Sequence, residues 1–336
     1  MQLLTGRRHD VIHNLDGEGA YEWLYVDALS DDAEWGVVMI LFRGMPMSPS
    51  YLERPTDMSA GCALSVYHRG TRVAFAFTGY PLAHAVFSEE HPHVSMGSAG
   101  CRTLDDGRWQ CSIQTLPTRI GRTANVQITL DAQWAAPSNE PYQRSNAWVL
   151  AAPRSKAQVT ILLGEGGQPK VEKEFEALAY HDHNMGPQAM QRHFHHWYWG
   201  RVQTSEKTLI YLATPGASEE FSWFGEADDR GQVVAWTNVT FAYKQPRLSF
   251  MGLWCNRTVV ISGTNAQGQQ DVVECHNKRV CENGPFYQRY ISQWKSNGKF
   301  IGSGMSEYMN VCRLRSAWIR PFLRLPWTMF SMSYKR

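Results

Sequence analysis

Short segments in which apolar and polar residues alternate, separated by turn residues, make up most of the chain. Aromatic and β-branched residues dominate them, and turn signals recur about every ten residues, a pattern typical of an antiparallel sandwich or barrel. We therefore expect an all-β fold. Strands are predicted at 21–28, 35–42, 62–68, 71–77, 109–116, 123–130, 146–151 and 157–163, then at 207–213, 221–226, 232–240 and 259–262.

Helical periodicity is rare in this sequence. The best helix candidates are residues 187–196 and part of the C-terminal tail. At roughly 150 residues per domain, 336 residues predict two domains, and that size suits an eight-stranded barrel with one ligand cavity. We expect two tandem antiparallel β-barrels with few short helices, an N-terminal one over 1–187 and a C-terminal one over 188–336, although no internal sequence repeat is visible.

Charge and cysteine content narrow the function classes. The 33 basic and 31 acidic residues are nearly balanced, which argues against nucleic acid as a partner. The first 14 residues contain no apolar stretch long enough for a signal peptide, and no apolar run approaches the roughly 20 residues of a membrane span. We expect a cytoplasmic protein, with its seven cysteines as free thiols because no export signal or Cys-x-x-Cys motif occurs.

Aromatic residues are unusually frequent, with 13 Trp, 14 Tyr and 14 Phe. Such a surplus suggests either a large apolar ligand or many strands with aromatic faces. On the predicted strand at 21–28, Trp23, Tyr25 and Asp27 share one face. The aromatic rings would either shield a carbocation, at roughly 0.5–2 kcal/mol each, or form the barrel core. Asp27 is a second candidate acid, an orienting partner or a turn cap.

The densest group of functional side chains lies at 180–186, at the end of a predicted strand. Alternation along a strand places Tyr180, Asp182 and Asn184 on one face, and His181 and His183 on the other. An aspartate in an apolar cavity holds its proton more tightly, because burial disfavours the charged form, and then serves as a general acid. The alternative is a hydrogen-bonded carboxylate at a strand end.

Five histidines lie close together, at 181, 183, 193, 195 and 196. Histidine is a common metal ligand, but a turn and a predicted helix separate the two groups, and no complete ligand spacing is present. We expect no metal and no cofactor. Instead, His181 and His183 are predicted to orient Asp182 or to line the mouth of the pocket. Trp197 and Trp199 follow closely and are further candidates for the pocket lining.

The tail over 313–330 mixes arginines with aromatic and aliphatic residues, among them Trp318 and Trp327, for which we expect surface positions. This mixture suits a membrane interface, and it suits a solvated strand or helix edge almost as well. Pro321 and Pro326 exclude one regular helix through the tail. Peripheral contact with the inner membrane surface through 313–330 is one prediction.

Several segments resemble the carotenoid 1,2-hydratases, also called hydroxyneurosporene synthases. They are residues 19–32, 36–42, 48–51 and 62–67, the motif Tyr180-x-Asp182-x-Asn184-x-Gly186, the pair Trp197-x-Trp199 and the ending Arg315-Ser316-Ala317-Trp318. The resemblance implies paired lipocalin-like barrels, a superfamily that also contains Diels–Alderases. It implies cofactor-independent protonation of a terminal isoprenoid double bond by Asp182, followed by capture of the tertiary cation by water.

The resemblance leaves the substrate open. Four features depart from the pattern of that family: His181, His183, the segment 187–190 and the insertion between 250 and 295. A lipophilic small molecule, either a polyene such as an acyclic carotenoid or a terpenoid, is the expected substrate. The alternatives are a terpenoid or polyketide cyclase or pericyclase on the same scaffold, and a non-catalytic binder of a lipophilic ligand.

Overall fold

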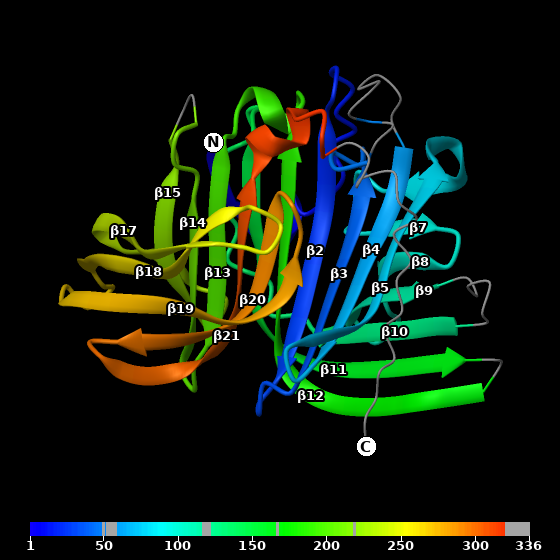
Figure 1. Cartoon of the computed structure of the whole chain (residues 1–336). Helices are drawn as coiled ribbons and strands as arrows, with labels where there is room; N and C mark the ends of the chain where they lie inside the picture. The colour runs from blue at the N-terminus through cyan, green and yellow to red at the C-terminus, as the bar shows by residue number, and fades with distance from the viewer. Residues whose placement is uncertain (49–50, 52–58, 116–121, 166–167, 218–219, 320–336) are drawn as a thin grey trace. The chain divides into compact units, whose positions relative to one another are not determined.

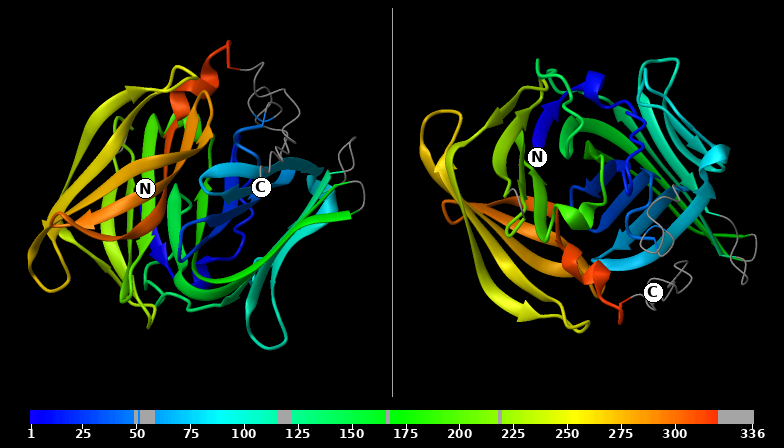
Figure 2. Two further views of the ribbon diagram at one scale, coloured as in Figure 1. Left: turned by 60° about the horizontal axis from the view of Figure 1, so that its bottom comes forward. Right: turned by 90° about the horizontal axis from the view of Figure 1, so that it is seen from above.

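The computed structural model describes residues 1–48, 51, 59–115, 122–165, 168–217 and 220–319. The chain forms two compact units that divide between Met190 and Gln191, three residues beyond the boundary predicted at 187. Each unit contains one large curled β-sheet (Figures 1 and 2). The predicted all-β fold of two antiparallel, barrel-like sheets with few short helices is confirmed. Among the described helices, none is long and apolar enough to cross a membrane.

The first unit contains a sheet of 12 strands. Its order is β5-β4-β3-β2-β12-β11-β10-β9-β8-β7-β6, and β1 adds to β11 as a parallel pair. The strands are β1 (Gln2–Thr5), β2 (Tyr21–Ser30), β3 (Trp35–Arg43), β4 (Ser59–His68), β5 (Thr71–Pro81), β6 (Ala85–Phe87), β7 (Val94–Met96), β8 (Ala99–Thr103), β9 (Trp109–Gln114), β10 (Arg122–Asp131), β11 (Ala147–Glu165) and β12 (Gln168–Gly186). Two 3-10 turns, η1 (Arg7–His9) and η2 (Leu82–His84), interrupt them.

The second unit contains a sheet of nine strands, in the order β16-β15-β14-β13-β21-β20-β19-β18-β17. The strands are β13 (His196–Gln203), β14 (Lys207–Ala213), β15 (Ser222–Asp228), β16 (Val233–Ala235), β17 (Thr237–Leu248), β18 (Trp254–Thr264), β19 (Gln270–Asn283), β20 (Tyr287–Ser296) and β21 (Lys299–Asn310). The 3-10 turns η3 (Met190–Arg192) and η4 (Val311–Arg315) flank the sheet in sequence.

Alternation explains which face of each strand is buried in the core. One face of β2, β3 and β4 carries aliphatic residues such as Leu24, Met39 and Leu64, which belong to the main core of the first unit. Tight turns join these strands. At the β4–β5 turn, Arg69 and Gly70 both have positive φ, 52° and 76°, which is the backbone of the two-residue hairpin turn that matches strand twist.

The predicted helix at 187–196 is wrong. Only the 3-10 turn Met190–Arg192 forms there, and β13 already begins at His196. Met190 and Phe194 are buried even though the segment forms no α-helix. Backbone groups of the segment bond elsewhere instead, as Ala189 N–H does to the carbonyl of Glu18.

Two strands predicted at 146–151 and 157–163 form one continuous strand, β11. Pro153 lies between them, and the pairing with β12 shifts register between Leu150 and Ala152 and again between Ala152 and Ser155. Such bulges accommodate a proline inside a sheet, because the proline has no N–H to donate. The strand therefore continues past the position where its apolar pattern breaks.

Candidate functional site

Two groups of three residues were each predicted to share a strand face, namely Tyr180, Asp182 and Asn184, and Trp23, Tyr25 and Asp27. These two triplets lie side by side on adjacent strands. β12 pairs with β2 in antiparallel register, so that Asp182 lies directly opposite Tyr25. Residues directly opposite each other in such a pair project from the same face of the sheet. One face therefore carries both triplets, with the pairs Tyr180–Asp27, Asp182–Tyr25 and Asn184–Trp23.

Asp182 accepts hydrogen bonds from three side chains. Its Oδ2 accepts a 2.6 Å bond from the Tyr180 hydroxyl and a 2.8 Å bond from Trp148 Nε1. Its Oδ1 accepts a 2.9 Å bond from Asn184 Nδ2. The residue is only 3% exposed.

Tyr180 differs from Trp148 in the hydrogen bonds that it is able to make with Asp182. An indole N–H only donates, while a phenolic hydroxyl both donates and accepts. When Asp182 carries the proton on Oδ2, the Tyr180 oxygen is therefore able to accept it. This pair holds a proton between two oxygens 2.6 Å apart within a buried face.

Trp148 was not predicted as a site residue. It lies on β11 opposite Asn184, is fully buried, and reaches Asp182 from the strand on the other side of β12. Alternation within 146–151 marks Trp148 as an inward-facing residue. Its contact with Asp182 depends on which strand pairs with β12, and this cannot be read from the sequence.

A second phenol–carboxyl pair lies beside the first. The Tyr25 hydroxyl donates a 2.7 Å hydrogen bond to Asp27 Oδ2, and Asp27 is fully buried. The rings of Tyr25 and Tyr180 meet edge to face with centroids 6.1 Å apart. Two carboxyl groups, each with its own phenol, thus share this face.

Aromatic rings extend the face toward β3 and β5. Trp23 stacks on Tyr21 with ring centroids 5.0 Å apart, and Trp23 lies 6.3 Å from Phe42 across the β2–β3 pair. Phe42 in turn meets Phe77 edge to face at 5.9 Å. These rings continue the face that carries the two carboxyl groups.

His181 and His183 lie on the opposite face of β12 and are fully buried. We predicted that they orient Asp182 or line the pocket mouth, but the structure gives them different partners. His181 Nε2 lies 2.8 Å from Asp10 Oδ2, its Nδ1 donates to the Tyr25 carbonyl at 2.8 Å, and its ring stacks on Trp109. Burial lowers the pKa of His181, but Asp10 and these hydrogen bonds outweigh it, so the pKa is raised.

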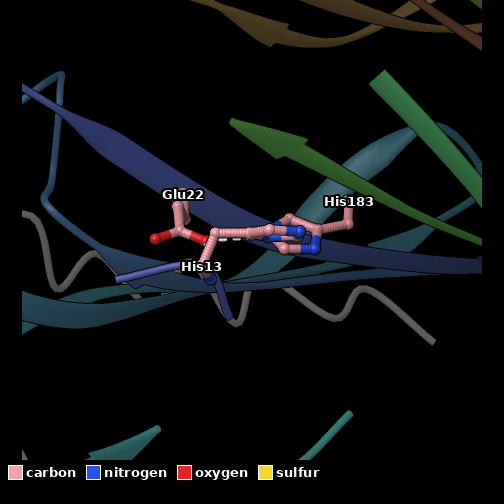
Figure 3. A group of neighbouring side chains, drawn as sticks. All are labelled: His13, Glu22 and His183. Atoms are coloured by element: carbon pink, nitrogen blue, oxygen red, sulfur yellow. Dashed lines mark hydrogen bonds and ion pairs between the residues drawn. The ribbon is translucent and has the colours of Figure 1, made fainter. Parts of the chain in front are cut away.

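His183 faces a different set of groups, shown in Figure 3. Its Nε2 lies 3.7 Å from Glu22 Oε2, and His13 Nδ1 lies 3.6 Å from the same oxygen. Burial lowers the pKa of His183 to about 4, so its imidazole is neutral near pH 7. Burial also acts to raise the pKa of Glu22, but hydrogen bonds from His13 and Leu15 and the nearby imidazoles lower it overall.

Comparison with known proteins assigns the chain to a family. The family model described as "Carotenoid hydratase CrtC" matches residues 39–329. The chain belongs to the CrtC carotenoid hydratase family. It is 25% identical to a protein named hydroxyneurosporene dehydrogenase of Chlorobaculum tepidum, over 94% of this chain and 89% of that one. It is also 24% identical to an acyclic carotenoid 1,2-hydratase of Thiocapsa roseopersicina, over 93% and 73%.

Solved structures support the fold of this CrtC family chain. An AttH-type protein of Nitrosomonas europaea superposes with a TM-score of 0.62 at 14% identity, covering 90% of this chain and 96% of that one. CghA, solved with Sch210972, superposes with a TM-score of 0.59 at 11% identity, covering 87% and 88%. At these identities the likeness shows the shared fold alone. The match to the family model, and not these structures, confirms the resemblance to the hydratases.

Trp197 and Trp199, the other two aromatic residues that resemble the CrtC pattern, lie on β13 in the second unit. Both are buried, and Trp197 Nε1 donates a 3.1 Å hydrogen bond to Glu307 Oε1. Glu307 also lies opposite Trp199 in the β13–β21 pair. Their role in lining a substrate pocket stays a prediction.

Part of the basic, aromatic tail is described. Arg313 lies in η4, donates a 2.9 Å hydrogen bond to the Pro285 carbonyl and packs over the Trp318 ring at 5.6 Å. Trp318 is 52% exposed, as expected for a surface position. Trp327 and the rest of 320–330 lie outside the described residues.

Proposed function

We propose that this CrtC family protein is a cofactor-independent hydratase that adds water to a terminal isoprenoid double bond of an acyclic carotenoid or related polyene. The observation that carries the proposal is Asp182, a buried carboxyl group hydrogen-bonded to Tyr180, Trp148 and Asn184. The relative named acyclic carotenoid 1,2-hydratase supports the substrate class.

The proposed reaction begins with transfer of a proton from Asp182 to the terminal carbon–carbon double bond. A C–H bond forms, and the adjacent carbon becomes a tertiary cation. Water attacks this cation, and the proton that water loses restores the acid. Alkene and water give an alcohol without any change in electron count, so the reaction requires no redox cofactor.

The surrounding side chains have separate proposed roles. Tyr180, Asn184 and Trp148 hold the carboxyl group in one orientation, and Tyr180 also accepts or returns the proton. Trp23 and Tyr25 present aromatic rings to the cation, each worth roughly 0.5–2 kcal/mol. Asp27, bonded to Tyr25, is the second carboxyl group of the same face and the second candidate acid.

Mass spectrometry of the product tests the reaction class. Incubation with an acyclic carotenoid should add the mass of one water, and Asp182→Asn should abolish this product while leaving the fold intact. Asn keeps the size and one carbonyl acceptor of Asp182 but cannot act as a carboxylic acid. General acid catalysis contributes typically about 10²–10⁴-fold, so turnover should fall by about 100-fold or more and leave the hydrated product effectively absent.

The other outcomes identify the alternatives. An unchanged product mass with altered retention would indicate a cyclase or pericyclase, and a loss of two hydrogens would indicate a desaturating enzyme. Binding without conversion would indicate a lipophilic-ligand carrier. Turnover of Asp182→Asn at the wild-type rate would contradict the assignment of the acid.

We further propose peripheral membrane contact through the exposed aromatic residues beside η4. Phe250 is 93% exposed and Trp254 61% exposed, and Arg313 donates to the carbonyl of the adjacent Gly252. Aromatic residues beside a basic side chain suit the lipid headgroup region. The Phe250→Ser, Trp254→Ser double variant should sediment less with anionic vesicles than wild type, whereas Phe300→Ser, which removes an exposed phenylalanine on β21, should not. Equal sedimentation of all three proteins would exclude this contact.

A further inference from the structure

Three potential metal ligands from three segments of the chain meet inside the first unit, on the face of β12 opposite Asp182. His13 comes from the irregular segment between η1 and β2, Glu22 from the start of β2, and His183 from β12. One ligand atom of each lies within 4.8 Å of the other two (Figure 3). Glu22 and His183 are fully buried, and the His13 side chain is 16% exposed.

The imidazole of His183 lacks hydrogen bonds. Both of its ring nitrogens are buried, and neither has a hydrogen-bond partner among the described residues. A neutral imidazole has one N–H donor and one lone pair, and burying either without a partner costs about 1–3 kcal/mol. Buried polar atoms without partners are rare in native proteins, and an ion that occupies the site is one of their ordinary explanations.

We propose that His13, Glu22 and His183 bind one divalent transition-metal ion of the zinc class. Two imidazoles and one carboxylate form a common protein donor set for such ions, leaving a further coordination position for water. At bond lengths of about 2.0–2.1 Å, donor atoms in a tetrahedral site are roughly 3.3 Å apart. The 3.6 and 3.7 Å separations from Glu22 Oε2 to the two imidazoles require only a small contraction.

Asp10 provides the outer partner that metal-bound histidines usually have. Its Oδ1 is buried without a hydrogen-bond partner among the described residues and lies 3.8 Å from His183 Nδ1. Nε2 of the same ring faces Glu22. A ligating histidine generally donates its second N–H to a carboxylate, which fixes the ring orientation. Coordination of the metal through Nε2 would leave the proton on Nδ1, facing Asp10. This accounts for the proximity of Asp10 to His183.

Arg43 is the positive charge that competes with a metal ion for Glu22. It lies 3.7 Å from Oε1, whereas the two histidines face Oε2. The carboxylate therefore presents separate oxygens to the guanidinium group and to the proposed ion. Asp10 adds a second buried carboxylate next to His183, so that two carboxylates offset the charge of Arg43 and part of the charge of the ion.

A metal ion at this position would attach the irregular segment around His13 to the strand that carries Asp182. His183 is the immediate neighbour of Asp182 and projects from the other face of β12. The proposed ion is therefore a structural element behind the catalytic face, and it does not contact the reacting atoms. This inference does not depend on the proposed hydration reaction.

The test is direct binding of Co²⁺ and Zn²⁺ to the full-length, tag-free protein after removal of metals by chelator and dialysis. We expect one equivalent of Co²⁺ with visible d–d absorption bands, which Zn²⁺ abolishes on displacement. Zn²⁺ at about 100 times its Kd should raise Tm by about 5 °C. His13→Ala should weaken Co²⁺ binding by at least about 10-fold, and Glu22→Gln should do likewise.

The matched control is His276→Ala. His276 Nε2 lies 2.8 Å from Glu274 Oε2 in the second unit, forming a histidine–carboxylate pair outside the proposed site. This variant should bind Co²⁺ as wild type does. His13 is partly exposed in an irregular segment, so its alanine variant tests the site even where a change at buried His183 prevents folding. The proposal is overturned when wild type shows no stoichiometric Co²⁺ spectrum, or when His13→Ala binds as tightly as wild type.

Discussion

Tyr25 lies directly opposite Asp182 across the β2–β12 pair, and its hydroxyl donates a hydrogen bond to Asp27. Asp182 accepts the hydroxyl of Tyr180, its neighbour two residues earlier on the same strand. Each carboxyl group thus pairs with a phenol on its own strand. The two pairs touch through the edge-to-face contact of Tyr25 and Tyr180.

This arrangement predicts that the two phenols are not equivalent. Tyr180→Phe removes a hydrogen bond to Asp182 and its proton-exchange partner. Leaving a buried polar group without one of its hydrogen-bond partners costs about 1–3 kcal/mol, which corresponds to a loss of turnover of roughly 5–100-fold. Tyr25→Phe leaves the contacts of Asp182 with Tyr180 and Trp148 in place, so its effect should be smaller. Initial rates of both variants with one carotenoid substrate measure the difference, and the reverse order would contradict the roles assigned here.

Trp148→Phe tests whether orientation of the carboxyl group matters separately from proton exchange. The substitution keeps an aromatic ring in a fully buried position but removes the indole N–H that donates to Asp182. We expect kcat to fall about 10-fold with little change in KM, because Trp23 and Tyr25, the rings proposed to face the substrate, are unchanged. Trp109→Phe, another buried indole of the first unit whose Nε1 bonds to the Pro92 carbonyl, is the control. It should reduce stability without this selective effect on kcat.

Alternation along the strands was enough to predict which side chains share a face. Tyr180, Asp182 and Asn184 do lie together, as do Trp23, Tyr25 and Asp27, because a strand's side chains alternate regardless of its partners. The contact between these triplets follows from strand order. β12 pairs with β2, which is more than a hundred residues earlier, and the sequence contains no local sign of that choice.

Long-range packing also explains what sequence analysis missed. Trp148, Asp10 and His13 meet the 180–186 motif from separate segments, so no local spacing connects them to it. The prediction of a helix at 187–196 was wrong for a related reason. Backbone groups of this segment bond to residues distant in sequence; for example, the His195 carbonyl accepts a hydrogen bond from the N–H of Val311.

The cysteines provide a test of the burial pattern. All seven are free thiols, six are buried and Cys312 is exposed. Burial raises the pKa of Cys62 to about 12 and that of Cys275 to about 11, so these thiols stay protonated at neutral pH. Burial also keeps a reagent from reaching them. A thiol reagent at neutral pH should therefore label about one cysteine per native chain and all seven after denaturation. Cys312→Ser should reduce native labelling almost to zero, and labelling of three or more native thiols would contradict the structure.

Gly304 should be the position in β21 that least tolerates a side chain. It pairs with Val202 and Ser292 between two neighbouring strands, and a Cβ added there would lie 2.0 Å from the Arg201 carbonyl oxygen and 2.9 Å from Trp294 Nε1. Because the closer atom belongs to the backbone, the sheet itself must move. Overpacking of this kind costs about 3 kcal/mol, so Gly304→Ala should lower the urea midpoint of the second unit's unfolding, while Ser303→Ala leaves it nearly unchanged. Equal midpoints for the two variants would show that β13 and β21 are farther apart at this position than the structure places them.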